Sequence, residues 1–147
     1  FRGVGSSTGV HTEIEGGMED VRAALDYMSA EYPDEDLTLA GFSFGSRTGM
    51  AVGIGDPRVA RLISIGTPVD KYTDYGFLVE ARKPILFVHG DSDEFGALEN
   101  VEKLVARVAA ETDAELVVFR NCGHFFDEHL NELRDAIKQW TIRKMPQ

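Results

Sequence analysis

One serine lies in a pattern that could make it a nucleophile. Ser43 is the centre of Gly-Phe-Ser-Phe-Gly at 41–45. A short apolar run, 37–40, precedes this pattern, and a segment with helical spacing, 46–54, follows it. A G-x-S-x-G pattern between a strand and a helix is typical of a nucleophile elbow, a strained turn that presents the serine Oγ at the end of a sheet. We expect both flanking glycines to be required, because a Cβ at either position would collide with the turn or the neighbouring strand. A glycine-bounded turn with a non-catalytic serine would have the same sequence pattern, so the surrounding residues must distinguish the two interpretations.

A serine hydroxyl needs a general base to take its proton, and histidine is the base expected here. The chain has four histidines, at positions 11, 89, 124 and 129. His124 is the best candidate, because it lies in a turn directly after the apolar strand predicted at 115–119, where a loop can reach the elbow. His89 ends another apolar strand and is expected to be structural. His11 and His129 are expected to face solvent.

An acid that orients the histidine should lie between the serine and the histidine in the chain. The segment His-Gly-Asp-Ser-Asp-Glu at 89–94 follows an apolar strand and contains three carboxylates. Such a cluster is usually a solvated turn, but this one ends a strand and lies at the right place in the chain. We predict Asp93 as the acid, because it lies far enough past the strand to reach a histidine on the next loop. Asp91 is the alternative, and Glu94 is expected to be exposed.

The spacing of apolar residues predicts the elements that must position these side chains. Helices are expected at 15–31, 46–54, 97–110 and 127–143, and strands at 37–40, 61–66, 84–89 and 115–119. The buried helix faces are expected to be Met18, Val21, Leu25 and Met28 in the first helix, Val101, Leu104, Val105 and Val108 in the third, and Leu130, Leu133, Ile137 and Trp140 in the last. This alternation predicts a single α/β domain, 1–147, with a mostly parallel sheet flanked by helices.

The longest irregular connection, 69–83, is too short for a lid domain, so the site is expected to be open and to favour small or exposed acyl groups. Six aromatic residues could line the substrate pocket or equally belong to the core: Phe42, Phe44, Tyr72, Tyr75, Phe95 and Phe125.

Ser43, Asp93 and His124, in this order and each at the end of a successive strand, resemble the catalytic triad of the α/β-hydrolase superfamily. Three further stretches match motifs of that superfamily. The loop after the superfamily's fourth strand matches FRGVGSSTG at 1–9. The acid turn matches HGDSD at 89–93, and the histidine turn matches GHFF at 123–126. The chain looks most like the small, capless bacterial esterase-like group, and the resemblance covers essentially all 147 residues.

The resemblance implies an α/β-hydrolase fold without a cap domain, in which the backbone N–H of Phe44 is one oxyanion donor. The family's strands before the FRGxG loop, with the loop that supplies another oxyanion N–H, would precede Phe1. We therefore expect the chain to be a C-terminal portion of the family fold. The strand at 37–40, which precedes Ser43, would then lie at an open, apolar edge of the sheet. Such an edge predicts a homodimer or an exchange of elements between copies of the chain.

Composition limits the partners. The net charge of −10 argues against nucleic acid and anionic membrane surfaces, since phosphate binding needs clustered Lys and Arg. No run approaches the roughly 18 apolar residues of a membrane span.

Cys122 is the only cysteine, so no intrachain disulfide is possible and a cytoplasmic location is expected. It shares one short turn with His124 and is poorly placed as a nucleophile. No ligand-type spacing predicts a metal, and no cofactor is expected.

The function predicted from these residues is hydrolysis of short-chain carboxylic esters through an acyl-enzyme. Ser43 would attack the carbonyl, His124 would act as base and then as acid, and Asp93 would orient His124. A thioesterase or a peptidase would use the same residues. A dienelactone-type hydrolase is less favoured, because it usually has cysteine at the position of Ser43. The alternative from another class is a non-catalytic domain with an incomplete oxyanion hole.

Overall fold

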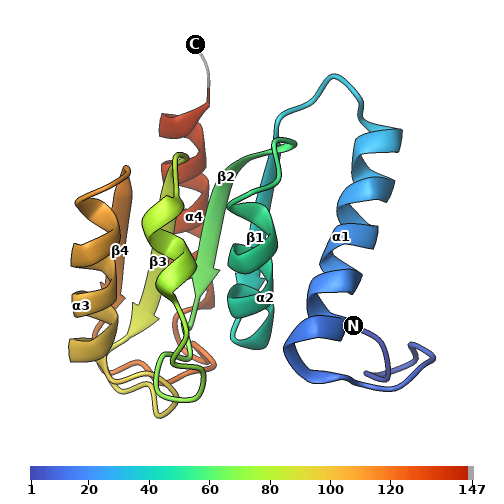
Figure 1. The fold of residues 1–147 in the computed structure, drawn as a ribbon. Helices are drawn as coiled ribbons and strands as arrows, with labels where there is room; N and C mark the ends of the chain where they lie inside the picture. The colour runs from blue at the N-terminus through green and yellow to red at the C-terminus, as the bar shows by residue number, and fades with distance from the viewer. Residues whose placement is uncertain (146–147) are drawn as a thin grey trace.

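The computed structural model describes residues 1–145, and its helices and strands alternate along the chain (Figure 1). The strands are β1 (Leu37–Phe42), β2 (Val59–Ile65), β3 (Ile85–Gly90) and β4 (Ala114–Phe119). The helices are α1 (Glu13–Glu31), α2 (Phe44–Gly53), α3 (Leu98–Ala109) and α4 (Leu130–Lys144), and a short 3-10 helix, η1 (Gly76–Glu80), lies between β2 and β3.

The strands form one parallel sheet in the order β1-β2-β3-β4. Ala40 of β1 pairs with Ile63 of β2, which in turn pairs with Leu86 of β3. Because all strands run in one direction, their carboxyl ends meet at one edge of the sheet, at the bottom of Figure 1. The predicted fold class, a parallel sheet flanked by helices, is confirmed. Its consequence is that the loops after β1, β3 and β4 lie together.

Helices cover the sheet from both faces. In Figure 1, α2, α3 and η1 lie in front of the sheet and α4 lies behind it, while α1 packs against α2. Ile85 and Phe87 of β3 enter the front core cluster, and Leu86 and Val88 enter the back cluster with Trp140 of α4. All of β3 is buried, as expected for a continuous apolar run in the middle of a covered parallel sheet. No helix within residues 1–145 is long and apolar enough to cross a membrane.

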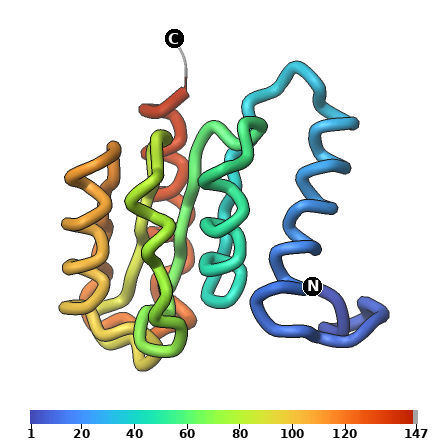
Figure 2. The backbone as a smooth tube through the Cα atoms, in the orientation of Figure 1, coloured from blue at the N-terminus to red at the C-terminus, as the bar shows by residue number. Residues whose placement is uncertain are grey.

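The opening loop folds back along the first turns of α1, as the backbone trace in Figure 2 shows. Arg2 holds it there: its backbone N–H and its Nε donate to the Asp20 carboxylate at 2.7 and 2.8 Å, and its guanidinium pairs with Glu19 at 2.9 Å. These contacts hold the pKa of Asp20 below its usual range. The loop therefore has a defined position beside the carboxyl ends of the strands.

Some details of the prediction are wrong. Helix α4 begins at Leu130 instead of 127, because residues 126–129 form a turn in which the His129 N–H donates to the Phe126 carbonyl at 2.8 Å. Leu130 is 60% exposed at the helix start and does not join the buried face. Met28 is also exposed, near the end of α1. His129, expected to face solvent, is half-buried beside an aromatic ring of β4.

Strand β1 is one of the two edge strands of the described sheet. It continues beyond the predicted end at 40, because Phe42 still pairs with Ile65 of β2. Ala40 is exposed, and Phe42 is 41% exposed. The strand that precedes Ser43 thus presents apolar side chains and one unpaired edge to its surroundings.

Candidate active site

The backbone at Ser43 has the strained geometry expected of a nucleophile elbow. Its φ of 52° lies in the left-handed region that non-glycine residues rarely adopt. A Cβ at Gly41 would overlap the carbonyl oxygen of Gly45, so glycine is required there. A Cβ at Gly45 would meet only the Phe1 ring, at 3.6 Å. The expectation that both glycines are required is therefore wrong for Gly45, because its Cβ would point away from the turn.

The structure brings the three predicted residues into one hydrogen-bonded chain. His124 Nε2 lies 2.8 Å from Ser43 Oγ, and His124 Nδ1 lies 2.7 Å from Asp93 Oδ2. His124 is 3% exposed, and the Asp93 side chain is fully buried. A buried carboxylate beside Nδ1 places the imidazole proton on Nδ1, which leaves Nε2 free to accept the Ser43 hydroxyl proton. The arrangement can move a proton from the serine to the histidine.

The second oxygen of Asp93 is also used. Asp93 Oδ1 accepts the Phe95 backbone N–H at 2.8 Å, which fixes the carboxylate in the acid turn. The His89 side chain lies beside this carboxylate, with its Nε2 3.7 Å from Asp93 Oδ2. The same Nε2 donates a hydrogen bond to the Gly96 carbonyl at 2.6 Å. His89 is fully buried and supports the turn, in agreement with its predicted structural role.

Asp91, the alternative acid, points to another partner. Its carboxylate accepts the Ser92 hydroxyl at 3.0 Å and the Cys122 backbone N–H at 3.3 Å, and so joins the acid turn to the histidine turn. Burial acts to raise the pKa of Asp91, but these hydrogen bonds outweigh it and hold this pKa below its ordinary value. Burial also raises the pKa of the Cys122 thiol, which keeps it in the poorly nucleophilic neutral form.

Aromatic rings surround the imidazole. The ring centres of Phe42, Phe95 and Phe125 lie 4.8, 4.7 and 5.2 Å from that of His124. Phe95 packs edge-on and half-buried, whereas Phe125 is exposed and forms the rim of the site. These contacts restrict the rotation of His124 and limit access of water to its hydrogen bonds.

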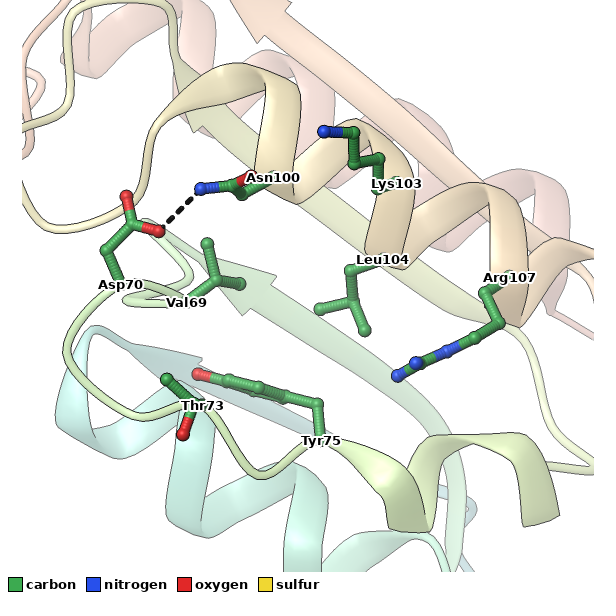
Figure 3. Close-up of a pocket in the computed structure, with 8 residues that line it drawn as sticks. All are labelled: Val69, Asp70, Thr73, Tyr75, Asn100, Lys103, Leu104 and Arg107. Atoms are coloured by element: carbon green, nitrogen blue, oxygen red, sulfur yellow. Dashed lines mark hydrogen bonds between the residues drawn. The ribbon is translucent and has the colours of Figure 1, made fainter.

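A pocket of about 370 Å³ opens beside Ser43. Its lining residues are Phe1, Val4, His11, Phe42, Ser43, Phe44, Gly45, Lys71 and Tyr72. The Phe44 ring is central in this wall, with the rings of Phe1, His11 and Tyr72 at 5.0, 5.2 and 6.3 Å. Of the six aromatic candidates, three line this pocket: Phe42, Phe44 and Tyr72. The other three do not: Phe95 and Phe125 pack on the His124 imidazole, and Tyr75 lines a different cavity (Figure 3).

The backbone after Ser43 offers hydrogen-bond donors. Phe44 and Gly45 begin α2, and the N–H groups of a first helical turn have no acceptor inside their own helix. They directly follow Ser43 in the chain, at the positive end of the helix dipole, where negative charge is favoured. Within residues 1–145, no group of three or more His, Cys, Asp or Glu side chains is arranged to hold a metal ion.

Sequence reasoning missed two parts of this site. Gly66, with φ of 57°, directly follows β2, and a Cβ there would lie 3.2 Å from the His124 ring. The sequence around it, a glycine followed by Thr-Pro at the end of a strand, predicts a turn but does not predict that this turn packs against the His124 ring. The opening loop also reaches the site through Phe1 and Val4, and no local pattern predicts such a long-range contact.

Known proteins are similar to this chain over almost its full length. A model of the dienelactone hydrolase family matches residues 4–141. An α/β serine hydrolase homologue from Coxiella burnetii is 37% identical, with a TM-score of 0.80 over 92% of this chain and 64% of its own. XC6422 from Xanthomonas campestris, an α/β serine hydrolase without a lid, is 30% identical, with a TM-score of 0.86 over 100% of this chain and 65% of its own.

One curated relative has similar coverage. The uncharacterized protein RP471 of Rickettsia prowazekii is 30% identical over 97% of this chain and 62% of its own length. The chain thus spans less than two thirds of the length of each of these relatives. The fold that the chain shares with the two solved structures is the α/β-hydrolase fold, which XC6422 has without a lid.

Proposed function

Because the chain belongs to the dienelactone hydrolase family, we propose that it is a serine hydrolase that cleaves carboxylic esters with short acyl groups. Family membership alone leaves the reaction open, since this chain has serine at position 43, where a dienelactone-type hydrolase usually has cysteine. A serine nucleophile activated by a histidine and a carboxylate supports acyl transfer from an ester, and a thioesterase or a peptidase would use the same residues.

The observation that carries the proposal is the hydrogen-bonded chain from Ser43 through His124 to Asp93, at 2.8 and 2.7 Å. In the reaction, Ser43 Oγ bonds to the carbonyl carbon while its proton passes to His124 Nε2. The tetrahedral intermediate then collapses, and the leaving alcohol takes that proton. Water attacks the acyl-enzyme with His124 again as the base, which releases the acid and restores Ser43.

Two groups beside Ser43 support this chemistry. The Phe44 backbone N–H is the proposed oxyanion donor, because it immediately follows the nucleophile and begins a helix. The pocket formed by Phe1, Val4 and Phe44 is the proposed acyl site. Its apolar walls fit an apolar acyl chain better than a polar one.

The experiment compares the parent protein with Ser43→Ala on p-nitrophenyl esters from acetate to octanoate. The parent is expected to turn over short esters, with the rate falling as the acyl chain lengthens. Ser43→Ala is expected to lose at least about 10³-fold in kcat. Ser29→Ala, at a half-buried serine of α1, is the matched control and is expected to keep full activity.

Further measurements separate the alternatives. A butyryl thioester and butyryl p-nitroanilide, tested beside p-nitrophenyl butyrate, distinguish an esterase from a thioesterase or a peptidase. A fluorophosphonate that adds its mass to the parent but not to Ser43→Ala would support an activated serine. If the parent and Ser43→Ala show the same rate of ester hydrolysis and the same fluorophosphonate labelling, the domain is non-catalytic and the proposal is wrong.

A further inference from the structure

Helix α1 contains two adjacent glycines near its start, Gly16 and Gly17. Glycine is an unfavourable residue inside a helix, because it loses more backbone freedom on folding than any other residue and has no side chain to pack. Both glycines are nevertheless buried. Their presence in a buried helix face therefore has to be explained by what packs against them.

The neighbour of Gly17 is the ring of Phe44, the first residue of α2. A Cβ at Gly17 would lie 2.7 and 2.8 Å from the Phe44 Cζ and Cε1 atoms. Carbon atoms pack at roughly 3.5–4.0 Å, so both of these contacts would be clashes. The bare backbone of α1 at Gly17 thus forms the seat of the Phe44 ring. Gly16 has a different neighbour, because its Cβ would overlap the Thr12 side chain.

A side chain at position 17 would displace the Phe44 ring more readily than its other neighbour. That neighbour is Thr48, whose Cγ2 would lie 2.9 Å from the added Cβ. Thr48 is fully buried, and its hydroxyl donates to the Phe44 carbonyl at 2.9 Å, which holds the side chain in place. The clashing atoms of Phe44, in contrast, lie at the far end of a rotatable side chain that is only half-buried. The Phe44 ring is therefore the part that gives way.

The Phe44 ring separates Gly17 from the pocket beside Ser43. Phe44 lines this pocket, whereas Gly17 does not. The rings that pack around Phe44 line the same pocket: Phe1, His11 and Tyr72. A Phe44 ring pushed away from α1 would move toward these rings and into the space that they enclose. The absence of a side chain at position 17 thus controls how much of the pocket is free.

We propose that Gly17 determines the specificity of this protein for the acyl group of its substrate. Because Gly17 has no side chain, the Phe44 ring rests on α1 and leaves the apolar space beside Ser43 open to acyl groups larger than acetyl. Gly17 touches neither the reacting atoms nor the acyl site, so it is a positioning residue that acts through Phe44. This role rests on the proposed ester hydrolysis and decides which esters are accepted.

The test compares hydrolysis of p-nitrophenyl butyrate and p-nitrophenyl acetate by the parent and by Gly17→Ala. The ratio of kcat/KM for butyrate to kcat/KM for acetate is expected to fall by about tenfold in Gly17→Ala, because lost room for a methylene group costs about that much. The value for acetate itself should change little. A variant that was only destabilised would lose activity on both esters alike, and the ratio would then stay constant.

Two further variants make the result specific. Gly49→Ala is the same substitution at a buried glycine of α2, where the added Cβ would meet Leu39 at an ordinary 3.7 Å, and it should leave the ratio unchanged. Phe44→Leu removes the ring that clashes with the added Cβ. In a Phe44→Leu protein, Gly17→Ala should therefore no longer change the ratio, which is the result that a direct contact between the two side chains predicts.

Binding to Ser43→Ala provides a readout that needs no turnover. Butyramide, an uncharged analogue of the acyl part, is titrated into isotope-labelled Ser43→Ala with and without Gly17→Ala and followed by NMR. Its affinity is expected to fall by at least about fivefold when Gly17→Ala is present. An inactive parent that shows this loss of affinity would refute the proposed ester hydrolysis and not the effect of Gly17 on the pocket. The role of Gly17 is overturned if folded Gly17→Ala changes neither the ester ratio nor the butyramide affinity, or if Phe44→Leu does not cancel its effect.

Discussion

The Asp93 carboxylate lies 2.7 Å from His124 Nδ1, although 31 positions of the chain separate the two residues. The contact forms because β3 and β4 are parallel neighbours, so the turns that follow them meet at one edge of the sheet. It orients the imidazole with Nε2 toward Ser43. Chain order left the choice of acid open between Asp93 and Asp91, and this contact supports Asp93 as the proposed acid.

Asp93→Asn should reduce activity while keeping the fold. The amide can occupy the same space, but it favours the imidazole tautomer that cannot accept the Ser43 proton. We expect kcat on p-nitrophenyl acetate to fall by about 10³–10⁴-fold. Asp91→Asn is the matched control and should retain activity within about tenfold, since Asp91 contacts the Cys122 backbone and not the imidazole. A greater loss for Asp91→Asn than for Asp93→Asn would contradict the proposed roles.

The two glycines of the elbow should respond differently to alanine. Gly41→Ala places a Cβ on the carbonyl oxygen of Gly45 and should destabilise the protein by about 3 kcal/mol. Gly45→Ala meets only the Phe1 ring at 3.6 Å and lies in the first turn of α2, where alanine is favoured. Its stability should stay unchanged or rise by up to about 1 kcal/mol. Urea unfolding monitored by circular dichroism measures both, and equal losses would count against this view of the turn.

Lys83 should be important for stability although it is far from the site. Its Nζ donates to the carbonyls of Gly53, Asp56 and Val59 at 2.7, 2.8 and 2.7 Å. Lys83→Met keeps most of the apolar stem but leaves these three acceptors without their donor, so we expect a loss of about 2–3 kcal/mol. Lys138→Met, on the exposed face of α4, is the control and should change stability by less than about 0.5 kcal/mol. Similar unfolding midpoints for the two variants would show that water replaces the ammonium.

Tyr75→Phe should stabilise the free protein. It removes a buried hydroxyl that has no partner within residues 1–145, without changing the shape of the ring. We expect a gain of about 1 kcal/mol, or a rise in Tm of about 2–4 °C for a domain of this size. Thermal unfolding followed by circular dichroism is the appropriate measurement. A clear fall in Tm would mean that the hydroxyl is satisfied in solution.

The open edge at β1 should lead to self-association. Ala40 is exposed on this edge strand, and an unpaired apolar strand edge favours pairing with another chain. We expect a homodimer by light scattering at micromolar concentration. Ala40→Lys should shift it toward the monomer, because a charge on an edge strand opposes pairing. Ala106→Lys, on the exposed side of α3, should leave the dimer intact. A monodisperse monomer of the parent would show that the edge does not pair.

Local patterns were sufficient for much of the fold and of the candidate site. The apolar spacing of Val101, Leu104 and Val108 predicted their burial, because a helix periodicity reflects only the nearest turns. The prediction failed at Leu130, where an additional turn delays the start of α4 and leaves the side chain in solvent. Such turns depend on packing against the sheet and have no strong signal in the neighbouring residues.

The sequence by itself determined the order of strands and helices along the chain, the G-x-S-x-G turn at Ser43 and the chain positions of the proposed acid and base. These features depend on backbone preferences and on side chains a few residues apart. Only the tertiary structure decided that Asp93 and not Asp91 meets His124, that the opening loop returns to Ser43, and that Arg47 stacks on Tyr75. Each of these contacts joins segments far apart in the chain, and their partners are selected by the packing of the whole sheet and its helices.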